Sequence, residues 1–126
     1  MNRSDLQAWL DRYVEAWRAN DATAIGALFT DDAVYRYRPY RDDALRGREA
    51  IVAGWLEEGE DPRGWEARYE AYAMDGDRGV ATGTTTYHAT ATESETTYHN
   101  VFLLRFAPDG SCAEFTELFM EQKPSE

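Results

Sequence analysis

Glu117 is the residue of this chain whose surroundings most strongly indicate chemistry. It stands between Phe115 and Phe119 in a β-rich segment near the C-terminus, and side chains two positions apart in a strand share one face. A carboxylate among aromatic rings is costly unless it is used or paired, so Glu117 is a candidate general acid or base. A β-bulge that reverses the face, or a hydrogen bond to a neighbouring tyrosine or arginine, would give it a structural role instead.

The two histidines, His88 and His99, each end a TTYH tetrapeptide. If Tyr87 and Tyr98 point inward, strand alternation turns both histidines outward, toward the surface or an interface. The opposite parity would place them in the interior as an acid–base pair, so they are the alternative catalytic residues. Two imidazoles without a third ligand make a poor metal site, and we expect neither a metal nor another cofactor.

Helices are expected to precede the strands that carry these residues. The first is an amphipathic helix that begins at Ser4, with Gln7 in a capping box, and ends at Asn20, where Asp21 caps the next helix. Its apolar stripe consists of Leu6, Trp9, Leu10, Tyr13, Val14 and Trp17.

Two shorter helices and a short strand complete the first half of the chain. The second helix carries Ile25, Leu28 and Phe29. The strand AVYRY follows it and ends before Pro39, which lacks a ladder donor. A third helix begins near Arg48 and carries Ile51, Val52, Trp55 and Leu56.

The second half of the chain is rich in Thr, Tyr, Val and Phe and predicts four strands, at about 65–74, 78–89, 96–107 and 112–121. The turn sequences at 75–76 and 108–110 indicate hairpins. Helices first and strands afterwards predict an α+β fold in which three N-terminal helices cover one face of an antiparallel sheet. Both faces of the last two strands are apolar, so we expect a homodimer through the outer sheet face.

Composition limits the classes of function. A chain of 126 residues with 43% apolar content forms one domain. A formal net charge of −11 disfavours nucleic acid and acidic membrane surfaces as partners. No apolar run suggests a membrane span or a signal peptide, so we expect a cytoplasmic protein. Cys112, the only cysteine, cannot form an internal disulfide and is expected in the core.

Five arginines reverse the sign of the charge locally, and they either pair with neighbours such as Asp42 and Asp43 or bind an anion. The cluster consists of Arg36, Arg38, Arg41, Arg46 and Arg48.

Three stretches resemble the nuclear-transport-factor-2-like superfamily in their order and spacing: DRYVEAWRANDATAIGALFTDDAVYRY, LRGREAIVAGW and YHNVFLLRFAPDGSCAEFTELFM. Within it the chain is similar to the SnoaL-like polyketide cyclases and ketosteroid isomerases, with residues 1–126 as a single domain. The resemblance implies a cone of three helices wrapped by a strongly curved antiparallel sheet, as in cystatin-like α+β folds. It also implies an internal apolar cavity and dimers formed through the outer sheet face.

The catalytic residues of a ketosteroid isomerase carry over only in part. Tyr13 lies where such an enzyme has the helix-1 tyrosine that donates to the substrate oxygen, although a tyrosine there also suits an ordinary core. The general-base aspartate expected near the end of the first strand is missing from YRYRP, and Phe102 replaces the acid of the oxyanion hole. Tyr13 therefore joins Glu117 as a candidate catalytic residue, whereas steroid isomerase chemistry is disfavoured.

Aligning the strands with the family's cavity side implies an aromatic chamber that suits a small hydrophobic, cyclic molecule. The resemblance leaves open a cofactor-independent isomerase, cyclase, dehydratase or epoxide hydrolase. A non-catalytic ligand-binding or protein-interaction domain is the alternative. Two ionisable groups within hydrogen-bond reach in the chamber would favour an enzyme. The ligand-binding candidates are Trp17, Tyr35, Tyr37, Trp55, Tyr87, Tyr98, Asn100, Phe102, Phe115 and Phe119, with Thr85 on the same face.

Overall fold

Helix α1 (Arg3–Ala19) begins with a capping box formed by Asn2 and Asp5. The Asp5 amide donates to the Asn2 side chain (2.9 Å), and the Asn2 amide donates to the Asp5 carboxylate (2.8 Å). The expected box of Ser4 and Gln7 is wrong, because Asn2 caps the helix two residues earlier and places Ser4 inside its first turn.

Gln7 has a different role, which is to fasten helix α1 to the edge of the sheet. Its side-chain nitrogen donates to the Tyr69 carbonyl (3.0 Å), and its side-chain oxygen accepts from the Ala71 amide (2.8 Å). These two bonds satisfy backbone groups of the edge strand and hold the helix across it.

The other two helices are α2 (Ala22–Gly26), capped by Asp21 as predicted, and α3 (Arg48–Glu58), which begins where it was predicted. Phe29 was assigned to the second helix, but it is the first residue of a strand. The Leu28 amide bonds to the Ile25 carbonyl three residues back (3.1 Å), and this tight turn ends the helix.

The structure is a computed structural model that describes residues 1–40, 43–59 and 61–123. Its six-stranded sheet has the order β2-β1-β6-β5-β4-β3. A 3₁₀ turn, η1 (Pro62–Gly64), leads into the third strand. The strands are β1 (Phe29–Arg36), β2 (Leu45–Arg46), β3 (Trp65–Asp75), β4 (Arg78–Tyr87), β5 (Thr96–Phe106) and β6 (Cys112–Glu121).

The four C-terminal strands match their predicted positions closely and form an antiparallel meander. The expectation of a wholly antiparallel sheet is wrong at one place, since β1 pairs with β6 in parallel. A hairpin forces its two strands to be antiparallel, but β1 and β6 are separated by most of the chain, so no turn fixes their relative direction. The two-residue strand β2 was not predicted.

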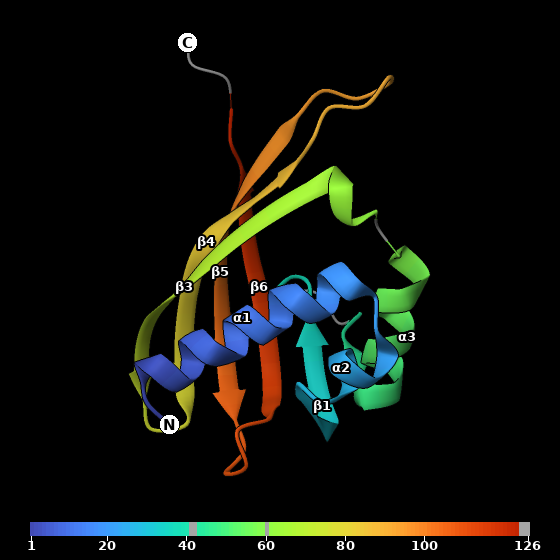
Figure 1. The fold of residues 1–126 in the computed structure, drawn as a ribbon. Helices are drawn as coiled ribbons and strands as arrows, with labels where there is room; N and C mark the ends of the chain where they lie inside the picture. The colour runs from blue at the N-terminus through green and yellow to red at the C-terminus, as the bar shows by residue number, and fades with distance from the viewer. Residues whose placement is uncertain (41–42, 60, 124–126) are drawn as a thin grey trace.

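Figure 1 shows α1 lying across the concave face of the curved sheet, with α2 and α3 grouped beside β1. The hairpin of β4 and β5 extends beyond the helices at the top of the view. Strand β5 has the predicted parity: Asn100 and Phe102 are buried on the inner face, whereas Val101 and Leu103 are 37% and 44% exposed on the outer face. Among the residues described, no helix is long and apolar enough to cross a membrane.

Candidate functional site

A pocket of about 560 Å³ lies between α1, the end of α3 and the inner face of the sheet. Most of its wall is aromatic, and its ionisable carboxyl groups are those of Glu117, Glu58 and Glu93. A more open hollow of about 690 Å³ lies near Met1 and the hairpin turns, where Phe106 is the one aromatic side chain among the described residues that line it. The aromatic pocket is therefore the candidate site.

The structure brings nearly all of the candidates named from the sequence to this pocket. Among the ligand-binding candidates Phe115 is the exception, because it is fully buried behind the wall. Its ring stacks on Tyr35 (4.5 Å between centroids) and on Tyr13 (5.5 Å). Strand alternation predicted the correct face of β6 for Phe115 but not that its ring is buried behind the pocket wall. The candidates that do line the pocket are Tyr13, Trp17, Tyr35, Tyr37, Trp55, Thr85, Tyr87, Tyr98, Asn100, Phe102, Glu117 and Phe119.

Glu117 points inward from β6 and accepts a hydrogen bond at Oε1 from Nδ2 of Asn100 on β5 (3.0 Å). Burial raises the pKa of Glu117 to about 7, and the negative charge of Glu58 acts in the same direction. The Asn100 hydrogen bond and the positive charge of Arg38 lower this pKa and offset part of the effect. A carboxyl group with this pKa is present in both protonation states near neutral pH, which suits a proton donor or acceptor.

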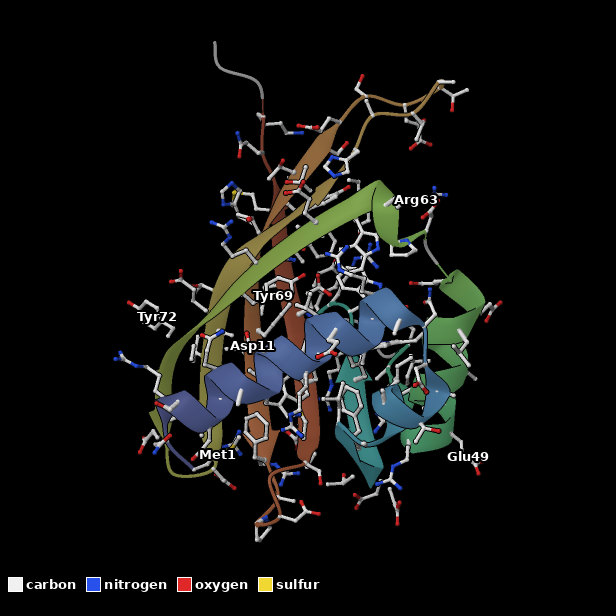
Figure 2. All side chains as sticks on the ribbon, in the orientation of Figure 1. Met1, Asp11, Glu49, Arg63, Tyr69 and Tyr72 are labelled. Carbon is white, nitrogen blue, oxygen red and sulfur yellow. The ribbon has the colours of Figure 1, made fainter. Side chains whose placement is uncertain are left out.

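Asn100 is held in turn by a hydrogen-bonded pair of hydroxyl groups. Thr85 Oγ1 donates to Asn100 Oδ1 (2.9 Å), and the Tyr69 hydroxyl lies 2.6 Å from Thr85 Oγ1. All three side chains are buried. In Figure 2, Tyr69 lies over the sheet beside α1, whereas Tyr72 projects from the same strand away from the body of the molecule.

Tyr69 lines the pocket but was missed in the sequence, although it follows Trp65 and Ala67 in a run of alternating inward positions. Gly83 is the signal that could have found it. Gly83 is the partner of Tyr69 on β4, and a Cβ there would come within 2.6 Å of the Tyr69 ring and 2.1 Å of the Arg68 carbonyl. The missing side chain gives the Tyr69 ring room to lie across β4 and reach Thr85.

Tyr13 and Tyr35 form a second polar group in the pocket, with their hydroxyl oxygens 2.9 Å apart. Burial is the main cause that raises the pKa of both hydroxyl groups well above the ordinary value, and the charge of Glu117 acts in the same direction on both. Both therefore keep their protons at neutral pH. The bond between them uses one hydrogen, and the other is available to donate to a bound molecule.

The alternative assignment of the histidines as an acid–base pair in the chamber does not fit the structure. His88 lies outside the pocket, with Nε2 3.2 Å from a Glu66 oxygen and Nδ1 3.6 Å from a Glu95 oxygen. His99 is exposed, and its Nε2 lies 2.8 Å from Gln122 Oε1. Alternation along β4 and β5 explains this placement, because Tyr87 and Tyr98 occupy the inner face.

Two arginines of the basic cluster, Arg48 and Arg38, have different surroundings. Arg48 pairs with Asp31 (2.7 Å) and donates to the Phe29 carbonyl (2.8 Å), whereas Arg38 lines the pocket with its guanidinium 5.7 Å from the Phe119 ring centre. Arg41 of the cluster and Asp42, one of its expected partners, lie outside the described residues. Sequence reasoning assigned Arg38 to this cluster and did not single out Glu58 at all.

The remaining candidate groups do not add chemistry to the pocket. Cys112 is fully buried, and burial raises the pKa of its thiol, so it stays protonated. In the part of the chain that the structure describes, no three His, Cys, Asp or Glu side chains gather in a way that could hold a metal ion.

Comparison with known proteins identifies the scaffold. No curated protein matches the chain. A solved structure of an NTF-2-like protein of unknown function from Burkholderia xenovorans is 19% identical with a TM-score of 0.72, covering 98% of this chain and 88% of that one. A protein named "putative ketosteroid isomerase" from Kribbella flavida is 18% identical with a TM-score of 0.73, covering 98% and 84%.

These similarities confirm the predicted α+β fold of three helices on a curved sheet, here mixed and not closed. The sequence pattern of the SnoaL-like domain matches residues 10–115, which is most of the chain. The protein with this aromatic interior therefore belongs to the SnoaL-like domain family, and it has the fold of NTF-2-like proteins.

Proposed function

We propose that this domain binds a small, mostly apolar, cyclic molecule in its aromatic pocket and transfers a proton to or from it through Glu117. One observation carries the proposal: a carboxyl group with a pKa of about 7 faces a pocket of about 560 Å³ that is otherwise mainly aromatic. Aromatic walls favour flat, apolar rings, and a half-ionised carboxyl group is suited to general acid–base catalysis at neutral pH.

The hydroxyl pair of Tyr13 and Tyr35 supplies the second role in this proposal. A proton taken from carbon leaves negative charge on a neighbouring oxygen of the substrate, and a hydrogen-bond donor stabilises that charge. The free hydrogen of the pair is such a donor, and both hydroxyl groups remain protonated at neutral pH. The pair also supports an enzyme, since it brings two ionisable groups within hydrogen-bond reach.

The arrangement supports isomerisation, cyclisation, dehydration or epoxide opening by acid–base chemistry more than steroid isomerisation in its family form. The carboxyl group lies on β6 rather than at the end of β1, where this chain has Tyr35, Arg36 and Tyr37. The sequence resemblance implies that Phe102 stands where a ketosteroid isomerase has its second oxyanion donor. The name of the similar protein from Kribbella flavida therefore does not predict the substrate of this chain, because the groups involved stand at different positions.

Non-catalytic binding is the second candidate, and one contact favours it. The single hydrogen bond that the described residues give Glu117 comes from Asn100, an amide that does not exchange a proton with it at neutral pH. A chamber that only stores a ligand would also need such a bond to hold the carboxyl group in place.

Two small aromatic probes separate the candidates. Binding of 2-naphthol tests the pocket, and it is monitored through the quenching of tryptophan fluorescence from Trp17 and Trp55. Ring opening of 5-nitrobenzisoxazole tests proton transfer: a base takes the proton from ring carbon, a nitrile forms, and the N–O bond breaks to leave a coloured phenolate. We expect the rate to rise with pH around a midpoint near 7 and to be lost in Glu117→Gln.

Glu70→Gln is the matched control, because Glu70 is an exposed carboxylate on β3 outside the pocket. It should leave both measurements unchanged. Binding of 2-naphthol without ring opening that depends on Glu117 would favour the non-catalytic candidate. If neither probe binds, the pocket does not have the function proposed.

A further inference from the structure

Four polar side chains from four neighbouring strands form one continuous hydrogen-bonded line across the inner face of the sheet. The line runs from Tyr69 on β3 to Thr85 on β4 (2.6 Å), then to Asn100 on β5 (2.9 Å), and ends at Glu117 on β6 (3.0 Å). Thr85 is 3% exposed and Asn100 is 5% exposed, so neither exchanges these partners freely for water.

The direction of every bond in this line follows from the number of hydrogens available. Asn100 Oδ1 can only accept, so the single hydroxyl hydrogen of Thr85 is used on Asn100. Thr85 therefore has none left for Tyr69, and the Tyr69 hydroxyl must donate to Thr85 Oγ1. With Oδ1 engaged by Thr85, the Asn100 amide presents its NH₂ group to Glu117 Oε1.

We propose that Thr85 is a positioning residue: held by Tyr69, its hydroxyl group orients the Asn100 amide so that the transferable proton of Glu117 is carried on Oε2. An oxygen that accepts from the amide at 3.0 Å has no room for a proton directed at the same NH₂ group. The proton of the neutral carboxyl group is thus placed on the other oxygen. This inference rests on the function proposed for Glu117 and names the atom that would exchange the proton.

Without the Thr85 hydroxyl, the amide could turn over and present Oδ1 to Glu117. A carbonyl oxygen beside a carboxylate stabilises the protonated form, in which Oε1 would carry the hydrogen and donate it to Asn100. The proton would then be held within the line of side chains instead of facing the ligand. Loss of the Thr85 hydroxyl should therefore make Glu117 harder to ionise, so that a smaller fraction of it can act as a base at neutral pH.

The other groups that act on Glu117 are not changed by this substitution. Arg38, in the segment after β1, lowers the pKa of Glu117, and Glu58, on α3, raises it. The charge of Glu117 in turn raises the pKa of tyrosines on α1, β1 and β3. A shift in the titration of Glu117 on removing a neutral hydroxyl group thus reports the orientation of Asn100. The tyrosines facing it from these elements are Tyr13, Tyr35, Tyr37 and Tyr69.

The test is the titration of the Glu117 carboxyl carbon by NMR on protein labelled at glutamate side chains, with the signal assigned through Glu117→Gln. Thr85→Val keeps the shape of the side chain and removes the hydroxyl, and it should raise the midpoint by roughly one pH unit. Thr85→Ser keeps the hydroxyl and should titrate like the wild type. Tyr69→Phe removes only the bond that holds Thr85 and should give a smaller rise.

Thr86→Val is the matched control. Thr86 follows Thr85 on β4, points to the opposite face and bonds to Thr97 Oγ1 (3.0 Å), so its loss should not move the Glu117 midpoint. An unchanged midpoint in Thr85→Val, or an equal rise in Thr85→Ser, would overturn the proposal. If Thr85→Val does not fold, Tyr69→Phe decides: a rise supports the proposal, and an unchanged midpoint overturns it.

The nitrobenzisoxazole reaction distinguishes this inference from the proposed function. In Thr85→Val the midpoint of the pH–rate profile should move upward together with the NMR midpoint. If Thr85→Val raises the NMR midpoint but the wild type shows no ring opening that depends on Glu117, the catalytic function is overturned. The role proposed for Thr85 in orienting Asn100 would still stand.

Discussion

The hydroxyl groups of Tyr13 and Tyr35 meet at 2.9 Å although one residue comes from helix α1 and the other from strand β1. Helix and sheet are thus joined by a polar contact at the wall of the pocket. Both rings also stack on Phe115, with planes within 13° and 4° of parallel. The packing of Phe115 between the two layers sets the position at which the hydroxyl groups meet.

A double-mutant cycle should detect this pair. Tyr13→Phe or Tyr35→Phe alone leaves the other buried hydroxyl without its partner and should cost on the order of 1–2 kcal/mol in the free energy of unfolding. The double variant removes both polar groups and should cost clearly less than the sum of the two single variants. Urea denaturation measures all four proteins. Additive costs would show that the hydroxyl groups do not depend on each other.

Glu117→Gln should stabilise the protein above neutral pH. The pKa of Glu117 is about 7 in the folded state against an ordinary value of 4.5, so the folded protein holds this proton more tightly than the unfolded chain. The contribution of Glu117 to stability is therefore greatest below about pH 4.5, decreases as pH rises to about 7, and decreases no further above it. The glutamine variant lacks this loss and should exceed wild type by on the order of 1–3 kcal/mol at pH 8.

Denaturant unfolding at several pH values from 4.5 to 8 measures this difference. Glu70→Gln provides the comparison, because Glu70 is an exposed carboxylate on β3 outside the pocket. A Glu117→Gln protein whose advantage over wild type is the same at every pH would mean that Glu117 titrates as it does in solvent.

Gly83→Ala should destabilise the sheet and disturb the hydrogen-bonded line that ends at Glu117. The new methyl group would lie 2.1 Å from the Arg68 carbonyl oxygen and 2.6 Å from the Tyr69 ring, so backbone or ring must move. Such overpacking costs roughly 1–3 kcal/mol. Thermal unfolding measures the loss, and Gly64→Ala, where the new methyl group meets no atom within 4 Å, is the control. Unchanged thermal stability would mean that Tyr69 has room to move.

The outer face of β5 and β6 is expected to form a homodimer interface, as the two apolar faces of these strands indicate. Val101, Leu103, Leu118 and Met120 are 37%, 44%, 37% and 75% exposed there. A patch of this kind is costly in water, and a second copy would cover it. Light scattering at micromolar concentration should give the dimer mass for the wild type and the monomer mass for Leu118→Lys.

Tyr72→Lys is the control for the dimer, because Tyr72 is an exposed aromatic residue on β3, outside this patch. It should leave the mass unchanged. A monomer in the wild-type sample would remove the prediction, and a dimer that persists in Leu118→Lys would place the interface elsewhere.

The sequence by itself determined the three helices, the four C-terminal strands and the faces of those strands, but not strand β2 or the helix-to-strand boundary at Phe29. Helical spacing located the stripe of α1, and turn residues located the hairpins of the meander. Alternation was enough to turn Glu117 inward and His99 outward, because the period of a strand is fixed by its backbone. These features depend on neighbours in the chain, which the sequence contains.

The tertiary structure alone decided contacts between residues distant in sequence. The parallel pairing of β1 with β6 and the depth of Phe115 depend on how helices and sheet pack, and no local pattern encodes them. The line from Tyr69 to Glu117 crosses four strands. Each of its bonds joins a side chain to a residue diagonally opposite on the next strand, which the strand register and the missing side chain at Gly83 make possible. Hydrogen bonds of this kind depend on distances of a few tenths of an ångström, which only the packed fold fixes.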